Sequence, residues 1–146
     1  MLETAQIPLL RNQLVQIPVC DGTLTLAGLD AAWGGNPDPS ILVTDCDERI
    51  LLAHHEPDHI LKLTDEQRQK VALQVSGHTH GGQICLPPGI VLARVHMGRR
   101  FVRGHYDLGD GTQVYVNRGI GTMTLPARFA CRPEITLLEI RNRARD

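Results

Sequence analysis

Residues 77–83 read GHTHGGQ, and the three glycines of this segment limit how the chain can run on either side of it. A glycine lacks a Cβ, so the backbone can turn sharply and a ligand atom can approach closely. The apolar run of residues 73–76 precedes the segment, and Pro87, Pro88 and Gly89 follow it. We therefore expect a short buried strand that leads into a loop.

His78 and His80 lie two residues apart within this segment. In an extended segment both side chains project to the same side, where they can face a common cavity. Neutral imidazole is a common ligand of zinc, iron and nickel, and it also serves manganese. A metal site is therefore one interpretation. The other is a polar glycine loop with solvated histidines, which is commoner for an isolated His-x-His pair.

A second group of polar residues, AHHEPD at residues 53–58, follows a strand expected over residues 49–53. Ligands of open α/β sheets usually bind at the carboxyl ends of the strands. His55 can point into the same cleft as His78 and His80, although a solvent-facing turn explains the sequence equally well. The isolated histidines are expected to lie on the surface or in the core: His59, His96 and His105.

The remaining pattern predicts one mixed α/β domain over residues 1–146. Asp-Gly separates two apolar runs at residues 14–19 and 23–29, which predicts a hairpin. Residues 64–72 begin with a capping box and are expected to be helical. The other expected elements are a loop at residues 32–40, a hairpin of residues 101–108 with 113–117, and an alternating strand at residues 134–140.

Charge and composition exclude several classes of protein. The net charge of -1 lacks the basic surplus of a nucleic-acid-binding protein. No leader-like start and no apolar run of about 18 residues is present, so we expect a cytoplasmic location. The four cysteines are widely spaced, which predicts free thiols rather than a zinc ribbon.

Three blocks occur in a specific order: ILLAHHEPD, QVSGHTHGGQICLP and YVNRGIGTMTLPARFACRPEITLLEI. In this order they closely resemble the calcineurin-like metallophosphoesterases, and in particular the subgroup with an extended GHTHGGQ. The resemblance covers about residues 14–140. It implies the C-terminal half of an α/β/β/α two-sheet sandwich, with a mixed sheet and late hairpins, and it implies metal-dependent hydrolysis of phosphate esters.

The resemblance also implies roles for individual residues. His55, two places before a proline, matches a metal ligand, with His54 as the alternative if the register differs by one. His78 matches a ligand of the same metal, and His80 matches a ligand of a second metal. These histidines are the expected catalytic and metal-binding residues for two divalent ions such as Mn, Zn or Fe.

Asn117 and Arg118 match a loop that closes against such a site and contacts the phosphate-ester substrate. The family motifs Asp-x-His, Gly-Asp-x-x-Asp and Gly-Asn-His-Asp do not occur in this sequence. We therefore expect a truncated or split gene product, or half of a site completed by a separate N-terminal partner or by a homo-oligomer. The alternative is a non-catalytic metal-binding or interaction domain, or a remnant. The subgroup also implies peripheral membrane contact.

Overall fold

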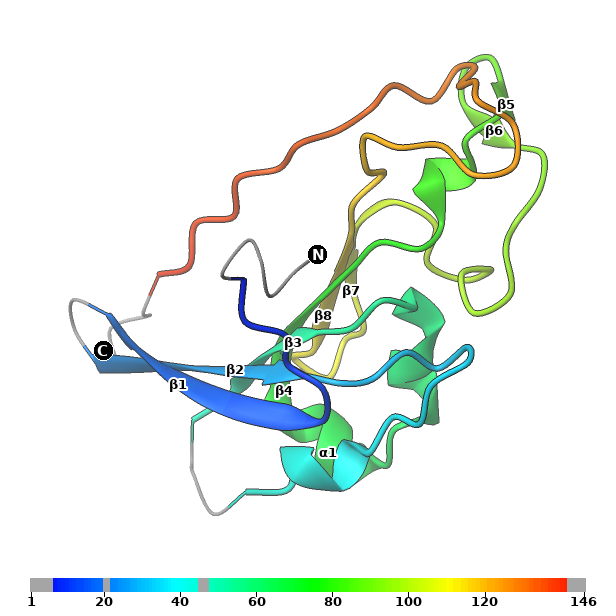
Figure 1. The fold of residues 1–146 in the computed structure, drawn as a ribbon. Coiled ribbons are helices and arrows are strands. Elements are labelled where there is room, and N and C mark those ends of the chain that lie inside the picture. Colours follow the sequence, from blue (N-terminus) through cyan, green and yellow to red (C-terminus); the bar gives the residue numbers. More distant parts are fainter. Residues whose placement is uncertain (1–6, 20–21, 45–47, 142–146) are drawn as a thin grey trace.

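A mixed six-stranded sheet forms the centre of the molecule (Figure 1). The computed structural model describes residues 7–19, 22–44 and 48–141. The strands lie in the order β1-β2-β3-β4-β8-β7, with parallel pairing from β2 to β8 and antiparallel pairing at both ends. Their bounds are β1 Gln13–Val19, β2 Gly22–Gly28, β3 Ile50–Ala53, β4 Val71–Ser76, β7 Gly104–Asp107 and β8 Gln113–Val116. The expected mixed α/β sheet is confirmed.

Both predicted hairpins are present in the sheet. β1 pairs with β2 in a register that joins Val19 to Gly22, while Cys20 and Asp21 lie outside the described residues. β7 pairs with β8 from Gly104 opposite Val116 to Asp107 opposite Gln113. The late strands are shorter than the apolar runs that predicted them.

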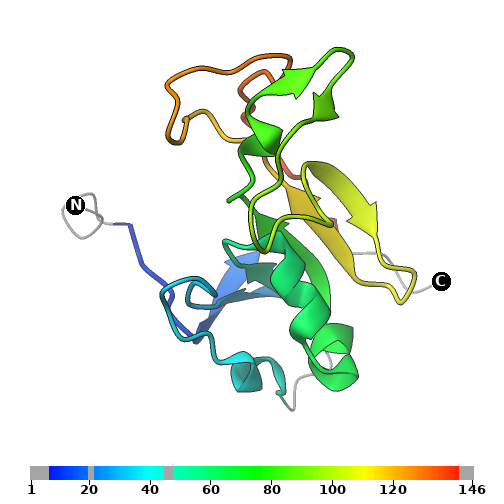
Figure 2. The same cartoon turned by 90° about the vertical axis from the view of Figure 1, so that its right-hand side faces the viewer.

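Two helical segments connect β3 to β4 and lie on one face of the sheet, which faces the viewer in Figure 2. They are the 3-10 helix η3 Pro57–Lys62 and the α-helix α1 Asp65–Lys70. Thr64 caps α1 in a capping box with Gln67, as predicted. The helix ends two residues earlier than expected, because Val71 and Ala72 already belong to β4 and Val71 is fully buried.

The core lies between the sheet and these helical segments. Apolar side chains from β3, β4, β8 and η3 are fully buried there, and each contributes about 1.5–3 kcal/mol to folding. Leu52, Ile60, Val71 and Val114 are members. None of the helices in the described part of the chain is long and apolar enough to cross a bilayer.

A short hairpin that the sequence did not predict stands apart from the main sheet, at the top of Figure 1. It consists of β5 Cys85–Leu86 and β6 Ile90–Val91, joined through the predicted turn at Pro87, Pro88 and Gly89. Within the described residues this pair is the only strand pairing outside the six-stranded sheet. Two-residue strands are too short to give a periodic signal.

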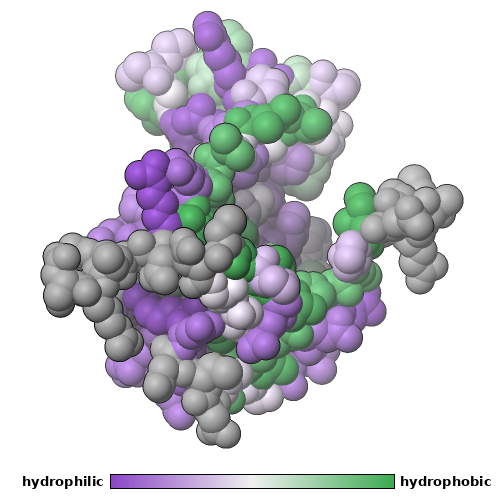
Figure 3. Space-filling model, turned by 90° about the vertical axis from the view of Figure 1, so that its left-hand side faces the viewer, coloured by the Kyte–Doolittle hydropathy of each residue, from purple (hydrophilic) through white to green (hydrophobic). Residues whose placement is uncertain are grey.

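The strand predicted at residues 134–140 is wrong. This stretch crosses the outside of the molecule without regular structure, and Ile135 and Leu137 are 88% and 96% exposed. A strand needs a neighbouring backbone to accept its hydrogen bonds, and no strand of the described residues pairs with it. Figure 3 shows further hydrophobic groups at the surface among hydrophilic ones.

Candidate metal centre

The two histidines after β3 point to different surroundings. The backbone here continues the parallel pairing with β4, because His54 N donates to Val75 O and Gly77 N donates to His55 O. His54 is buried, and its ring lies 4.6 Å from that of His59. His55 is exposed beyond the strand end. Of the two candidate registers, the structure therefore directs His55 outward and His54 into the interior.

The GHTH segment after β4 is a tight turn rather than the extended segment that we expected. His78 and His80 have φ angles of 66° and 50°, in the left-handed region. Thr79 N donates to Gly77 O, and Gln83 N donates to His80 O. Local hydrogen bonds thus outweigh the cost of the left-handed residues, so simple alternation does not set where these imidazoles point.

His55 and His78 come into direct contact. Their ring centroids lie 5.0 Å apart with an interplanar angle of 74°. Burial lowers the pKa of His55 from its ordinary 6.5, the Glu56 carboxylate raises it, and His78 and His80 lower it again. The overall direction is downward, which favours the neutral imidazole that a metal ion requires.

The hydrogen bond of His78 determines its tautomer. His78 Nε2 lies 2.7 Å from the carbonyl oxygen of His96. A carbonyl oxygen only accepts, so Nε2 must carry the proton and donate. In the neutral ring Nδ1 then keeps its lone pair, and a histidine in this form can bind a metal ion through one nitrogen while the other holds the ring in place.

His80 has a buried ring nitrogen with no partner. Its Nδ1 is shielded from solvent and forms no hydrogen bond with the described residues. The backbone of His80 is held from the other side, because Arg128 Nη1 donates to its carbonyl oxygen over 3.0 Å. An unsatisfied buried nitrogen costs about 1–3 kcal/mol, and a metal ion would relieve that cost.

A cavity of about 500 Å³ opens beside His55, at the carboxyl ends of β3, β4 and β8. Its lining residues are Ala53, His54, His55, Val75, Ser76, Gly77 and Asn117. The cavity therefore lies at the carboxyl ends of parallel strands, where ligands of open α/β sheets usually bind. His78 and His80 are not among the lining residues.

Several curated proteins are similar to this chain over most of its length. The uncharacterized metallophosphoesterase YkuE of Bacillus subtilis is 40% identical over 135 residues, which cover 90% of this chain and 46% of YkuE. The phosphodiesterase YaeI of Escherichia coli is 34% identical and covers 95% of this chain and 49% of YaeI. The uncharacterized metallophosphoesterase Cj0846 of Campylobacter jejuni is 35% identical and covers 92% and 35%.

This chain belongs to the metallophosphoesterase family. It spans about half the length of the first two relatives. No family model matches the chain. No solved structure gives a significant match.

The ring nitrogens of His55, His78 and His80 are chemically suited to bind a metal ion, but the three side chains are not grouped around one point. His78 and His80 each have a free ring nitrogen, and His55 is drawn toward the neutral form. Within residues 7–19, 22–44 and 48–141, however, no three His, Cys, Asp or Glu side chains are grouped so that they could hold a metal ion. His55 and His78 form the one ring contact among these three histidines in the described residues.

Asn117 and Arg118 are tied to the chain itself. Asn117 lines the cavity, but its amide nitrogen donates to Thr136 Oγ1 over 3.0 Å and its oxygen accepts from Gly119 N over 2.6 Å. Arg118 Nε lies 3.3 Å from Glu134 Oε2. The expected contact of Arg118 with phosphate therefore competes with an existing ion pair.

Two acidic residues to which the sequence analysis gave no role, Glu56 and Asp58, anchor backbone segments close to the candidate histidines. Glu56 is buried and accepts hydrogen bonds from Ala32 N and Trp33 N, each over 3.0 Å. Asp58 accepts from the backbone N–H groups of residues 99–101. The signal in the sequence was their place directly after a strand end, but their partners lie about 20 and 40 residues away.

Burial keeps His54 neutral next to Glu56. Burial and the neighbouring His59 lower the pKa of His54 to about 4, although Glu56 opposes this shift. His54 Nε2 lies 3.5 Å from Glu56 Oε2, and neither ring nitrogen has a hydrogen-bond partner. At neutral pH the two side chains are therefore in contact without forming an ion pair.

Proposed function

We propose that this chain supplies the histidine part of a dinuclear metal site that hydrolyses phosphate esters. The proposal rests on the contact between His55 and His78, which the parallel pairing of β3 with β4 brings to one edge of the sheet. The name of YaeI, a phosphodiesterase, supports a phosphate ester as the substrate class.

Under this proposal His55 and His78 bind one divalent ion and His80 binds the other. Such ions, when bound, would supply charge that polarises the phosphoryl oxygens and makes a bound water more acidic. The chain orients the ligands: His96 O fixes His78 through its Nε2 hydrogen, and Arg128 holds the backbone of His80. Asn117 lines the cavity and is the proposed contact of the ester, which would have to replace its hydrogen bonds to Thr136 and Gly119.

Neutral imidazoles alone do not balance the charge of two dications, so the proposal includes carboxylate ligands from elsewhere. Among the described residues no carboxylate joins the histidines in a group of three that could hold a metal ion. A separate N-terminal half or a second copy of the chain is the proposed source. Glu56 is not proposed for this role, because it is buried and each of its oxygens is directed at a backbone N–H group, of Ala32 or of Trp33.

Metal binding and turnover test the proposal separately. Binding of Mn²⁺ or Zn²⁺ is measured by calorimetry, and hydrolysis is measured with a bis-nitrophenyl phosphodiester. His78→Ala removes a proposed ligand and is expected to weaken metal binding by more than the roughly 10–100-fold that loss of a residue supporting a ligand costs. His105→Ala is the matched control, because His105 is exposed and bonds only to Gln113 in the described structure.

The two readouts distinguish the outcomes. Metal binding that His78→Ala removes, without turnover in any preparation, points to a metal-binding domain rather than an enzyme. Hydrolysis that survives His78→Ala, His80→Ala and His55→Ala contradicts the role of the histidines.

A further inference from the structure

A second cavity, of about 560 Å³, lies apart from the histidines and contains three arginines. Its lining residues are Arg94, Arg99, Arg100, Phe101, Tyr106 and Asp107. We call these six residues the arginine pocket. The whole chain has a net charge of -1, so three arginines lining one cavity are a local concentration of positive charge.

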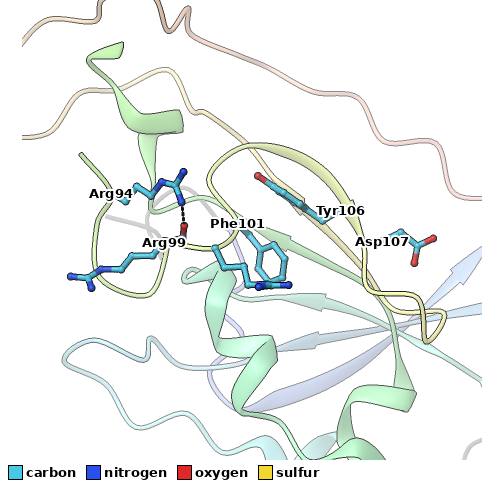
Figure 4. A pocket seen from close by; sticks show the side chains of 6 residues that line it. Arg94, Arg99, Phe101, Tyr106 and Asp107 are labelled. Carbon is cyan, nitrogen blue, oxygen red and sulfur yellow. Dashed lines mark hydrogen bonds between the residues drawn. The ribbon is translucent and has the colours of Figure 1, made fainter. Parts of the chain in front are cut away.

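The guanidinium groups of the arginine pocket are not neutralised by carboxylates. Among the described residues none of the three forms an ion pair. Figure 4 shows Arg94 and Arg99 on one side of the two aromatic rings and Asp107 on the other. Asp58, the other nearby acid, directs its oxygens at backbone N–H groups. Unpaired, planar guanidinium groups are the usual ligands of phosphate.

The backbone that carries these arginines is held in place. Asp58 accepts from Arg99 N over 2.7 Å and from Phe101 N over 3.0 Å, and Arg94 Nη1 donates to Arg99 O over 2.8 Å. A carboxylate that accepts several backbone hydrogen bonds fixes a loop firmly. The arginines are therefore presented from a rigid turn, which lowers the entropy cost of binding.

The aromatic rings give the arginine pocket a fixed apolar wall. The ring centroids of Phe101 and Tyr106 lie 4.9 Å apart, and Phe101 is buried. The Tyr106 hydroxyl accepts from Val102 N over 3.0 Å and from Arg103 N over 3.3 Å. An apolar wall beside cationic side chains reduces solvent screening of a bound anion.

The same loop touches the candidate metal centre. His96 O holds His78, and Met97 O accepts from Asp58 N over 3.0 Å. Gly98 packs so closely that a Cβ there would come within 2.6 Å of the Thr79 side chain. Residues 96–98 thus contact the turn that carries His78 and His80, and they lie between Arg94 and Arg99 of the arginine pocket.

We propose that the arginine pocket binds a phosphate group through Arg99 and Arg100, with the apolar wall of Phe101 and Tyr106 beside it. This goes beyond the hydrolytic site and needs no bound metal. The ligand class is a multiply charged phosphate, either free in solution or at the head of a lipid. Arg94 positions the loop through its bond to Arg99 O.

The test is calorimetric titration of metal-free protein, kept in chelator, with inorganic pyrophosphate. Arg99→Gln with Arg100→Gln is expected to weaken binding about tenfold or more, since each removes a charge-assisted hydrogen bond. Arg132→Gln is the control, because Arg132 is exposed and lies outside the pocket, and its effect is expected to stay within about twofold. The double variant Arg99→Lys with Arg100→Lys keeps the positive charges but loses the planar guanidinium groups that can donate two parallel hydrogen bonds. An intermediate affinity is expected.

Vesicles separate the two sources of phosphate. Sedimentation with phosphatidic acid vesicles, compared with phosphatidylcholine vesicles, reports a lipid-borne phosphate. Loss of either kind of binding in the glutamine double variant supports the proposal and names the source. If neither ligand binds, or if the double variant binds as well as Arg132→Gln, the proposal is overturned. Because no metal is present, this result is independent of the test of the histidines.

Discussion

The imidazole rings of His55 and His78 meet edge to face, with centroids 5.0 Å apart, although they follow two different strands. The parallel pairing of β3 with β4 brings them together, because it places Ala53 beside Val75. One residue of slip would direct His55 to the opposite side of the strand. The buried His54 occupies that side.

Asp58→Asn is expected to lower the free energy of unfolding by about 1–3 kcal/mol, because hydrogen bonds to a charged acceptor are stronger than those to an amide. Urea denaturation measures this change, and amide hydrogen exchange at Arg99 and Phe101 should become faster. Asp107→Asn is the control, since among the described residues the Asp107 carboxylate accepts a hydrogen bond from Gly109 N alone. Equal effects of the two changes would contradict the anchoring role of Asp58.

Glu56→Gln is expected to destabilise the protein by about 1–3 kcal/mol, because a side-chain amide must turn its NH₂ group toward Ala32 N or Trp33 N. Amide exchange at Ala32 and Trp33 should accelerate with it. Glu139→Gln provides the comparison, since Glu139 is exposed and pairs with Arg141 near it in sequence. A stability change no larger than that of Glu139→Gln would show that the buried carboxylate is dispensable.

Gly81→Ala is expected to cost about 2 kcal/mol or more and to weaken metal binding. Gly81 has φ +64°, and an added Cβ would lie 2.7 Å from Arg118 Cγ and 2.9 Å from Cys131 Sγ. Gly34→Ala is the control that separates backbone strain from steric crowding, because Gly34 also has a positive φ, of +80°, but an added Cβ would meet no atom within 4 Å. About 1 kcal/mol is expected there. Thermal unfolding and calorimetric metal titration measure both variants, and similar losses in the two would rule out crowding.

Asp110→Asn is expected to change the response of stability to acid. Hydrogen bonds from Thr112 N and Arg68 lower the pKa of Asp110 from 3.8 to about 2. The folded state therefore prefers the carboxylate, so its contribution is full above pH 3.8 and disappears as the pH falls through about 2.

The size of this effect is small, about 1 kcal/mol or less, because a third of the Asp110 side chain is exposed and water screens it. The variant should be less stable at pH 7 and should lose less stability between pH 4 and pH 2. Urea midpoints at these values measure the difference. Asp65→Asn removes the other carboxylate that pairs with Arg68 and is 84% exposed, so its curve should follow the wild type.

Local sequence signals predicted the elements whose partners are close in the chain. Asp-Gly between apolar runs predicted the β1–β2 hairpin, and Thr64 with Gln67 predicted the start of α1. The end of α1 was missed because Val71 is a buried member of the sheet, and tertiary packing decides such boundaries. Residues 134–140 alternate like a strand, but a strand also needs a neighbour, which no local pattern reveals.

The candidate site divides in the same way. The sequence indicated His55, His78 and His80 through their spacing and their place after strands. The turn that sets the φ angles of His78 and His80 depends on hydrogen bonds made by the folded chain. The role of Asp58 could not be predicted from the sequence, because its partners, residues 99–101, become neighbours only after folding. Four free cysteines were predicted, and Cys85 and Cys131 are free and buried, while Cys20 and Cys46 lie outside the described residues.

The hydroxyl of Thr79 donates to Val102 O over 2.6 Å and accepts from Gly81 N over 3.1 Å. This hydroxyl therefore links the turn that carries His78 and His80 to Val102, which follows the arginines of the pocket in the chain. If a ligand at one site changes the affinity of the other site by some factor, the second ligand changes the affinity of the first site by the same factor. Any effect of a cation on the imidazoles on the affinity for an anion beside Arg99 and Arg100 would be matched by an equal effect in return, and Thr79→Val tests whether this hydroxyl transmits it.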